Sequence, residues 1–168
     1  MKRRLRKSYV RIRRSLRVVL NTSPIIVLVE LGILSETLNL FSEVEVPSGV
    51  LEELERKKDE VYQELTRAIS EGRIRVEDVK RRLPRLGLGE SSAILLALTR
   101  GKIVVLDDKR ARRLARELGL EVIGTLSVLK KLHESGALAE TPSTIYRRLI
   151  EIGFYIDKKL FDKVFQGK

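Results

Sequence analysis

The chain has 168 residues, which is enough for one domain that buries a complete hydrophobic core without a disulfide or a structural metal. It contains no cysteine, which excludes disulfide frameworks, zinc–thiolate sites and cysteine nucleophiles and fits a reducing cytoplasm. Its formal net charge is +11, so a polyanionic partner is one possibility that depends on how the charge is distributed.

The positive charge is concentrated at the start of the chain. Residues 1–17 hold nine Lys or Arg and no acidic residue, which leaves 25 basic and 23 acidic residues for the rest. We predict a flexible basic arm over residues 1–16 and one domain over residues 17–168. The arm either binds a polyanion through counterion release or is a solvated tail, and both interpretations stay open.

Two apolar runs after the arm, residues 18–20 and 25–29, superficially resemble a signal peptide. Asn21, Pro24 and Glu30 interrupt them, and no run approaches the roughly 20 apolar residues that span a bilayer. We therefore expect a soluble, cytoplasmic protein.

Strands and helices are predicted to alternate along the domain. Short β-branched runs predict strands, and apolar residues three and four apart predict helices. The expected strands are residues 17–20, 44–46, 73–76, 103–106 and 121–123. The expected helices are residues 25–31, 35–41, 49–58, 59–70, 90–98, 109–118, 126–134, 144–152 and 158–165.

Ser23 and Pro24 give the first predicted helix its start signal. Serine is a favoured N-cap and proline is favoured at the first helical position, so we expect the helix to begin just after Ser23. Asn21 then lies at the carboxyl tip of the first strand. Helices of crossover length between successive strands predict an α/β fold with three layers, α/β/α, and a central parallel sheet of about five strands.

Three carboxylates stand where free charges are unexpected. Glu90 is followed at i+3, i+4 and i+7 by apolar residues, so its side chain lies on the inward stripe of its helix. Asp107 and Asp108 end a strand, and ligands of open α/β sheets bind outside the carboxyl ends of the strands. Because buried carboxylates repel each other unless a cation neutralises them, the pattern predicts a divalent ion with oxygen ligands.

Together these motifs resemble those of the PIN-domain nucleases, and specifically their VapC-like toxin branch. The motifs are the strand exit Asn21-Thr22-Ser23-Pro24, Glu53 on a neighbouring helix, Gly87-x-Gly89-Glu90, and Asp107-Asp108-Lys109-Arg110-Ala111-Arg112. The resemblance extends over roughly residues 16–165.

The resemblance implies an endoribonuclease that uses Mg²⁺ or Mn²⁺ to cut single-stranded RNA, as the toxin of a toxin–antitoxin pair. It further implies a protein antitoxin and a homodimer, for which the apolar surface of the helices in residues 21–33 and 35–41 is the expected contact.

The same residues suit hydrolysis of a phosphodiester, which needs an activated water and a stabilised leaving oxygen. Glu90 and Asp107 or Asp108 would be the inner metal ligands, and Glu53 would flank them. Asn21 stands where most of the wider family has Asp. An amide oxygen can coordinate the ion but brings no charge, so we expect a lower metal affinity.

Polar and basic residues flank the expected site. Thr22 and Ser23 can offer hydroxyls to a phosphate or to water near the ion. Arg85 ends a basic loop, and Arg110 and Arg112 lie on the helix after Asp108, so all three are candidates for phosphate contacts. A solvated surface is the plainer interpretation of these arginines.

Each proposed ligand also has a structural interpretation that the sequence leaves open. Asp108 can be the N-cap of the helix that follows it. Glu90 can be a first-turn carboxylate favoured by the helix dipole. Glu53 can belong to a solvated helix face, and Asn21 can be a turn residue bonded to its own backbone.

Two other functions compete with the nuclease. The helix at residues 144–152 has basic flanks, and with the basic arm it suggests a DNA-binding module. The second competitor is a PIN-like protein without catalysis that acts in RNA binding or assembly.

Overall fold

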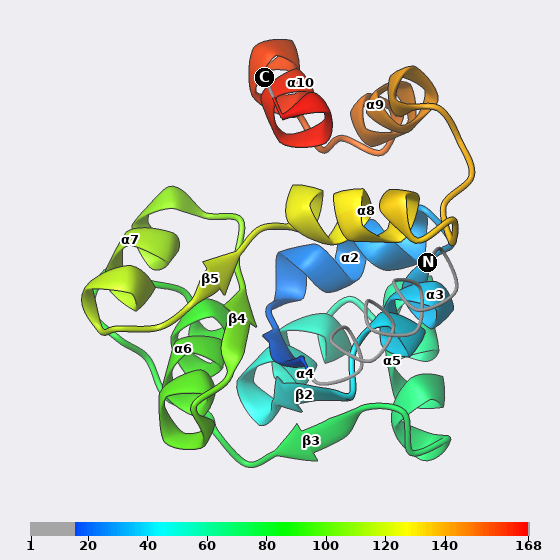
Figure 1. Ribbon diagram of the computed structural model, residues 1–168. Helices are drawn as coiled ribbons and strands as arrows, with labels where there is room; N and C mark the ends of the chain where they lie inside the picture. Colours follow the sequence, from blue (N-terminus) through cyan, green and yellow to red (C-terminus); the bar gives the residue numbers. More distant parts are fainter. Residues whose placement is uncertain (1–15, 168) are drawn as a thin grey trace, which may run out of the picture.

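A five-stranded parallel sheet forms the centre of the computed structural model, which describes residues 16–167 (Figure 1). The strands are β1 (Arg17–Leu20), β2 (Glu43–Pro47), β3 (Arg75–Glu77), β4 (Ile103–Val105) and β5 (Val122–Ile123). They stand in the order β3-β2-β1-β4-β5, and every neighbouring pair is parallel. The predicted α/β fold is confirmed, whereas nearly all of the predicted basic arm lies outside the described residues.

Side chains of the central strands alternate between two helical layers. Val18 and Leu20 of β1 face the larger core, which contains side chains of α2 (Thr22–Glu30), α3 (Leu34–Leu40), α4 (Ser48–Glu55), α5 (Glu60–Ser70) and α8 (Thr125–Glu134). Val19 of β1 and Val104 of β4 face the second core, which contains side chains of α6 (Leu88–Arg100) and α7 (Lys109–Glu117). No helix of the described chain is long and apolar enough to cross a membrane.

Two further helices, α9 (Pro142–Glu151) and α10 (Lys158–Gln166), lie outside α8 and away from the sheet (Figure 1). Phe161 of α10 is fully buried and stacks on Phe165 with ring centroids 4.4 Å apart. Tyr146 of α9 meets Phe161 edge to face at 5.2 Å. This aromatic cluster holds the C-terminal helices together and joins them to the larger core.

The predicted elements are found with small shifts at their ends, but the predicted start of the first helix is wrong. Helix α2 begins at Thr22, so Ser23 and Pro24 lie inside it. Asn21 is its N-cap residue, with no hydrogen bond from the side chain to the helix. The Asn21 N–H bonds to the Val105 carbonyl at 3.3 Å and completes the pairing of β1 with β4. The strand pairing therefore ends at Asn21, and the helix begins at the next residue.

A charge cluster lies at the amino ends of the strands, opposite to the predicted site. Lys102, which precedes β4, is almost fully buried and lies 2.6 Å from Glu45 and 3.0 Å from Glu43. These contacts, led by the Lys102 bond, lower the pKa of Glu43. Because each buried charge has an oppositely charged neighbour, the cluster is explained as part of the fold.

Candidate metal and phosphodiester site

The candidate site is at the carboxyl ends of three adjacent strands. Asn21 follows β1 directly, Asp107 follows β4 after Leu106, and Thr125 follows β5 after Gly124. Because these strands are parallel neighbours, their carboxyl ends meet at one edge of the sheet. The structure therefore brings Asn21 and Asp107 to the same edge, as the sequence predicts.

Asp107 is held in place by hydrogen bonds from the next strand exit. Its Oδ1 accepts from the Thr125 N–H at 2.8 Å, and its Oδ2 accepts from the Thr125 hydroxyl at 2.6 Å. The Ser23 hydroxyl approaches the same Oδ2 at 3.5 Å, a long and weak contact. Thr125 is fully buried, so the Asp107 carboxylate has a fixed orientation and remains half exposed to a ligand.

Arg112 lies beside Asp107 and faces inward. Its guanidinium donates to the Leu106 carbonyl at 3.3 Å and is close to Gly124, where a side chain would collide with it. Burial is the largest effect on the pKa of Arg112 and lowers it, while the charge of Asp107 acts in the opposite direction. Arg112 therefore helps to balance the charge of Asp107 from within the fold.

Glu53 of α4 is tied to two other elements. Its Oε2 accepts from the Thr22 hydroxyl at 2.6 Å, and its Oε1 accepts from the Gly89 N–H at 2.8 Å. The side chain is half-buried, so Glu53 does not belong to a freely solvated helix face. Thr22 uses its hydroxyl to hold this carboxylate.

The position of Glu53 depends on a close crossing of α4 and α6. Gly49 lies against Ser92, and a Cβ on Gly49 would overlap the Ser92 side chain. Gly89 lies on α6, where a Cβ would lie 2.5 Å from Oε2 of Glu53, which is one turn after Gly49 on α4, and 2.6 Å from the Thr22 hydroxyl. Two glycines, one on each helix, therefore let the helices approach closely enough for Glu53 to reach the N-terminus of α6.

Glu90 lies in the first turn of α6 and beside Glu53. Its Oε2 accepts from the Gly87 N–H at 3.3 Å. A methyl group placed on Gly87 would lie 3.8 Å from this oxygen and 3.7 Å from Glu53 Oε1, so the two carboxylates face the same small space. Burial raises the pKa of Glu90, the Gly87 N–H opposes that change, and the charges of Asp108 and Glu53 raise it further.

Asp108 caps the helix that follows it. Its Oδ1 accepts from the Ala111 N–H at 3.0 Å, as the capping interpretation predicts, and the residue is exposed. Its charge nevertheless contributes to the raised pKa of Glu90, so it lies near enough to act on that carboxylate. Asp107 and Asp108 thus have different surroundings, since only Asp107 is fixed by the neighbouring strand exit.

Asn21 has the least satisfied side chain at this edge. The residue is 3% exposed, and no hydrogen-bond donor of the described residues reaches its buried Oδ1. A buried acceptor without a donor is costly, so it is a good partner for a cation. Asn21 and its acidic neighbours offer only oxygen donors, which fits a hard divalent ion such as Mg²⁺ or Mn²⁺.

The acidic side chains are not gathered into a complete metal shell. Among the residues that the structure describes, no group of three or more His, Asp or Glu side chains could hold a metal ion. Glu53 and Glu90 form one group, and Asp107 is bonded to Thr125 instead. A metal would therefore have to draw on the Asn21 amide oxygen or on side-chain rotations.

Two residues of the site are absent from the sequence prediction. Thr125 follows a strand end in the same way as Asn21 and Asp107, so the rule that identified those residues also points to it. Gly89 is part of a motif in the sequence, but its role depends on the contact between α4 and α6, for which the sequence gives no signal. The predicted basic residues Arg85 and Arg110 both line a hollow between the loop before α6 and α7.

One comparison with known proteins identifies the type of domain. The family model described as "DUF3368: PIN domain" matches residues 17–167. Among solved structures, the chain is similar to a PilT N-terminus domain protein from the hyperthermophilic archaeon Sulfolobus solfataricus P2, with 17% identity and a TM-score of 0.42 over 75% of this chain and 97% of that chain. No curated protein matches the chain.

Proposed function

The chain belongs to the PIN-domain family, and from that premise we propose that it is a metal-dependent endoribonuclease that hydrolyses single-stranded RNA. The observation that carries the proposal is the buried, unbonded Oδ1 of Asn21 at the edge of the sheet where Asp107 also lies. PIN domains are generally nucleases that use divalent metal ions, and this edge offers the oxygen atoms that such an ion prefers.

Asn21, Glu90 and Asp107 would hold the ion, with Glu53 flanking them. The ion, Mg²⁺ or Mn²⁺, would supply positive charge to the scissile phosphate and to the leaving oxygen. The strand exit at Thr125 fixes Asp107 before any substrate arrives, so little reorganisation is needed on that side.

Glu90 would hold the ion in its ionised form. Burial and, to a smaller extent, the charges of Asp108 and Glu53 raise its pKa in the metal-free chain, so metal binding would be coupled to loss of the Glu90 proton. Glu53 cannot take the same part easily, because Thr22 and Gly89 already occupy its two oxygens. Burial is the main cause of the raised pKa of Glu90, and the fixed negative charge of Glu53 adds a smaller contribution.

The finer proposal is that the chain is a toxin of the VapC-like branch with a protein antitoxin and a homodimeric state. Its support is the motif set from Asn21-Thr22-Ser23-Pro24 to Asp107-Asp108. The apolar residues of α2 and α3 are mostly buried in the chain itself, and Ile26 and Val29 are the half-buried residues of α2 that a second copy would cover. Light scattering on the purified chain tests the dimer directly.

Cleavage of labelled single-stranded RNA tests the nuclease. We expect cutting with Mg²⁺ or Mn²⁺, none with a chelator, and a loss of about 100-fold or more in Glu90→Gln and Asp107→Asn. Glu55→Gln is the matched control, because Glu55 is an exposed carboxylate on α4 for which no partner is found in the described chain.

Cutting that persists in Glu90→Gln would contradict the proposal. RNA binding without cutting, with or without metal, would instead support a PIN-like binding protein, which the amide at Asn21 also allows.

A further inference from the structure

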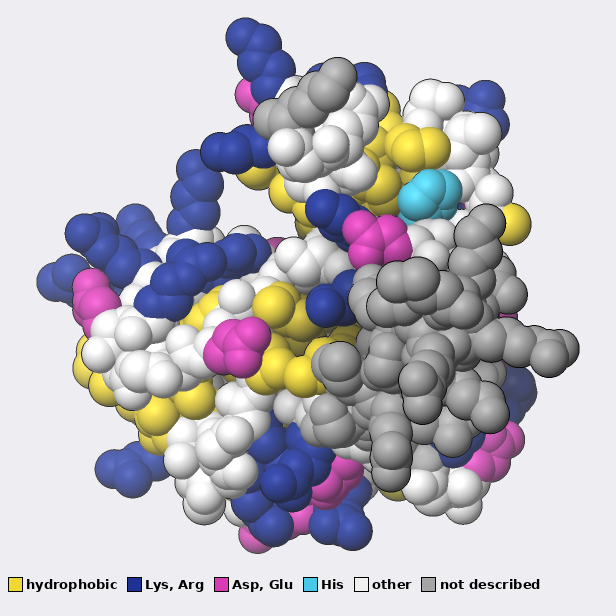
Figure 2. Space-filling model, viewed as in Figure 1, with side chains coloured by type: hydrophobic (Ala, Val, Ile, Leu, Met, Phe, Trp, Pro, Cys, Tyr) yellow, Lys and Arg dark blue, Asp and Glu magenta, His cyan; other side chains and the backbone are white. Residues whose placement is uncertain are grey.

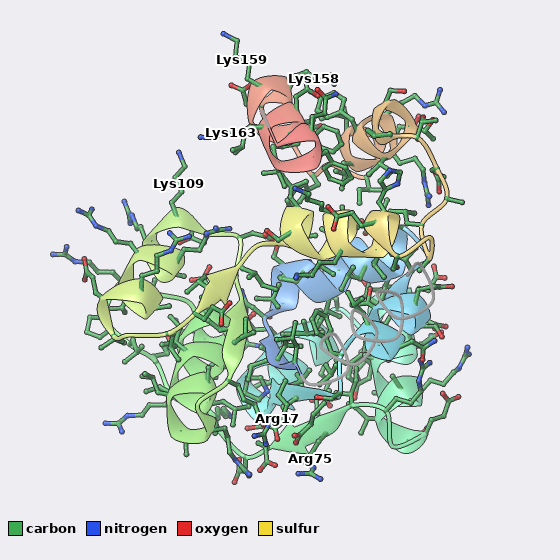
Figure 3. All side chains as sticks on the ribbon, in the orientation of Figure 1. Arg17, Arg75, Lys109, Lys158, Lys159 and Lys163 are labelled. Atoms are coloured by element: carbon green, nitrogen blue, oxygen red, sulfur yellow. The ribbon has the colours of Figure 1, made fainter. Side chains whose placement is uncertain are left out.

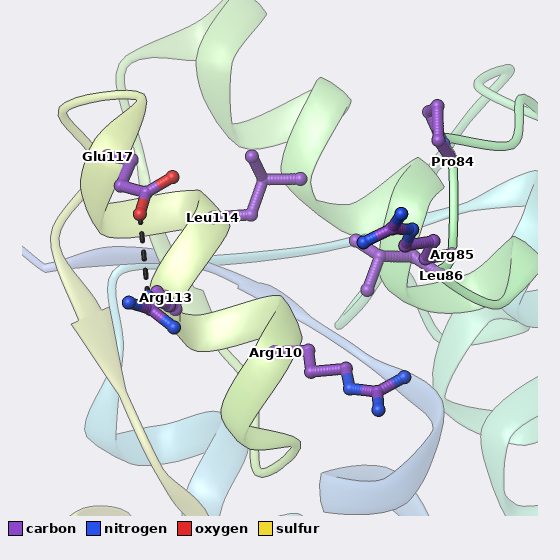
Figure 4. Close-up of a pocket in the computed structure, with 7 residues that line it drawn as sticks. All are labelled: Pro84, Arg85, Leu86, Arg110, Arg113, Leu114 and Glu117. Atoms are coloured by element: carbon purple, nitrogen blue, oxygen red, sulfur yellow. Dashed lines mark ion pairs between the residues drawn. The ribbon is translucent and has the colours of Figure 1, made fainter.

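A hollow of about 550 Å³ lies between the loop before α6 and the outer side of α7 (Figure 4). It has no part in the proposed chemistry described above. Its lining residues are Pro84, Arg85, Leu86, Arg110, Arg113, Leu114 and Glu117. Its volume lies within the range of about 300 to 1,000 Å³ that is usual for small-ligand sites.

The lining combines an apolar surface with guanidinium groups. Pro84, Leu86 and Leu114 supply the apolar part. Arg113 is paired with Glu117 at 3.6 Å, as the dashed line in Figure 4 shows. Arg85 and Arg110 form no ion pair with any described residue, so their charges are available to an anion. A planar apolar group joined to an anion would match both parts of this lining.

Arg85 is held in an unusual backbone conformation. Its φ of 66° is in the left-handed region, which glycine occupies easily and a residue with a Cβ occupies at a cost in free energy. An arginine at such a position is a reason to look for a function of its side chain.

The hollow adjoins the carboxylates through two short segments of chain. Leu86, which lines it, is followed at once by Gly87, whose N–H bonds to Glu90. Arg110 lies two residues beyond Asp108, the cap of the same helix. Leu86 and Arg110, which line the hollow, therefore each lie within four residues along the chain of a carboxylate of the candidate site.

We propose that this hollow binds the nucleotide next to the scissile phosphate. Arg85 and Arg110 contact its phosphate, and its base lies on Leu86 and Leu114. The inference rests on the proposed nuclease function for the location of the scissile phosphate, but the binding of RNA in the hollow can be measured without cleavage. The hollow accepts an unpaired base, so the substrate is single-stranded at this point.

The test is RNA binding by the full chain with Glu90→Gln, so that no cutting occurs. The probe is a fluorescently labelled single-stranded RNA of ten nucleotides, titrated at several salt concentrations. Arg85→Gly removes the guanidinium and suits the left-handed backbone, and Arg110→Gln removes a charge from an exposed helix position. Lys58→Gly is the matched control, because Lys58 is exposed, basic and also has a positive φ of 45°.

Each hollow variant is expected to weaken binding several-fold and to lower the salt dependence of the association constant by about 0.7 per lost contact. Lys58→Gly is expected to bind like the parent protein. A series of RNAs with one abasic position is expected to show a loss of about tenfold at a single position, and that loss is expected to disappear in Arg85→Gly/Arg110→Gln.

Unchanged affinity and salt dependence in Arg85→Gly/Arg110→Gln would overturn the inference, even if an acidic peptide were found to bind there. The result is independent of the cleavage assay. RNA bound through the hollow but not cut by the parent protein would remove the proposed function and leave the hollow only as an RNA-binding site. RNA cleavage by the parent protein, together with unaltered binding in Arg85→Gly/Arg110→Gln, would remove the inference and leave the proposed function.

Discussion

Asn21 and Glu90 are the two residues whose surroundings are most informative. Asn21 keeps a buried acceptor without a donor among the described residues, and Glu90 has a carboxylate whose ionised form is disfavoured by burial and by two neighbouring acids. Both conditions cost free energy in the absence of a cation. Both would be relieved by one, so the stability of the protein should respond to metal and to the charge of Glu90.

Glu90→Gln is expected to stabilise the metal-free protein at neutral pH. The pKa of Glu90 is raised above its ordinary 4.5 in the folded chain, so folding is favoured while the group is protonated and that contribution is lost as pH rises through the folded pKa. Glutamine removes the charge and keeps an oxygen for the Gly87 N–H. Thermal unfolding should therefore show a higher Tm for the variant at pH 7, with the difference shrinking toward pH 4.

Bound metal should instead give the parent protein a higher Tm than Glu90→Gln. At 100 times its Kd, Mn²⁺ stabilises a protein by about 2.7 kcal/mol, which corresponds to a rise in Tm of about 5 to 10 °C for a chain of this size. We expect that rise in the parent protein and little or none in Glu90→Gln. An equal rise in both proteins would show that Mn²⁺ binds elsewhere.

Asp108→Ser tests whether Asp108 acts only as the N-cap of α7 or also contributes to RNA cleavage. Serine is also a good N-cap, so the free energy of unfolding should change by less than about 0.5 kcal/mol. Loss of the Asp108 charge should lower the pKa of Glu90, and the acid limb of the pH–rate profile for RNA cleavage should move to lower pH. A loss of activity as large as that of Asp107→Asn would show instead that Asp108 is itself a ligand.

The sequence predicts much of the site at the residue scale and misses part of it for a physical reason. Asn21 and Asp107 are predictable because strand ends can be identified from β-branched runs. The bonds of Glu53 to Thr22 and Gly89 are not, because they join residues 31 and 36 positions apart. Of the two predicted roles of Asp108, the cap of α7 is confirmed and the metal ligand stays a prediction, while its charge also acts on Glu90.

At the scale of elements, the crossing of α4 and α6 determines where Glu53 lies. Gly49 and Gly89 permit the approach, and Ser92 fills the space beside Gly49. The sequence predicts both helices, yet it gives no sign that they touch at these points. The predicted start of α2 is wrong because of another contact between distant segments. The pairing of β1 with β4 overrides the capping preference of Ser23.

Gly89→Ala tests the importance of this crossing. The added methyl group would lie 2.5 Å from Glu53 Oε2 and 2.6 Å from the Thr22 hydroxyl, so Glu53 or α6 must move. A displacement of about 1 Å at a reacting centre can cost about 100-fold in rate, and we expect a loss of that order in RNA cleavage. The measurement is kcat/KM on a short RNA substrate.

Gly87→Ala is the comparison for this variant. Its methyl group would meet the two carboxylates only at 3.7 and 3.8 Å, which are ordinary contact distances. We expect it to retain far more activity than Gly89→Ala. Equal losses in both variants would indicate that the start of α6, rather than the position of Glu53, is responsible.

The C-terminal helices bear on the competing DNA-binding interpretation. Arg148 of α9 pairs with Glu140 and donates to the Leu31 carbonyl at 2.6 Å, so its side chain is used inside the fold. Helix α9 follows α8 after residues 135–141 and packs on α10 through Tyr146. These contacts show that part of the basic character of α9 serves the fold. Helix α10 is then the more exposed basic helix.

At the scale of the whole molecule, basic side chains of α7 and α10 border a recess visible in Figure 2. Lys109 on α7 and Lys159 and Lys163 on α10 lie in the upper left part of Figure 3. Arg17 and Arg75 lie near the lower edge of the same view. Those two arginines are paired with Glu43 in the cluster at the amino ends of the strands. The side of the molecule with α7 and α10 is therefore the one that a polyanion should meet first.

Lys159→Gln/Lys163→Gln should weaken RNA binding without changing the fold. Both side chains are exposed, and loss of two phosphate contacts should reduce the salt dependence of binding to single-stranded RNA by about 1.4. Lys57→Gln/Lys58→Gln removes the same charge from an exposed turn after α4 and should bind as the parent does. An equal effect of the two pairs would show that only net charge matters.

The central claim is that oxygens of Asn21, Glu90 and Asp107 share one divalent ion. Anomalous diffraction from a crystal grown with Mn²⁺ measures this most directly, because it locates the ion without any assumption about activity. We predict one strong peak in contact with Asn21 Oδ1 and with the carboxylates of Glu90 and Asp107, absent in Glu90→Gln. A peak elsewhere, or none at this edge of the sheet at a saturating Mn²⁺ concentration, would contradict the account.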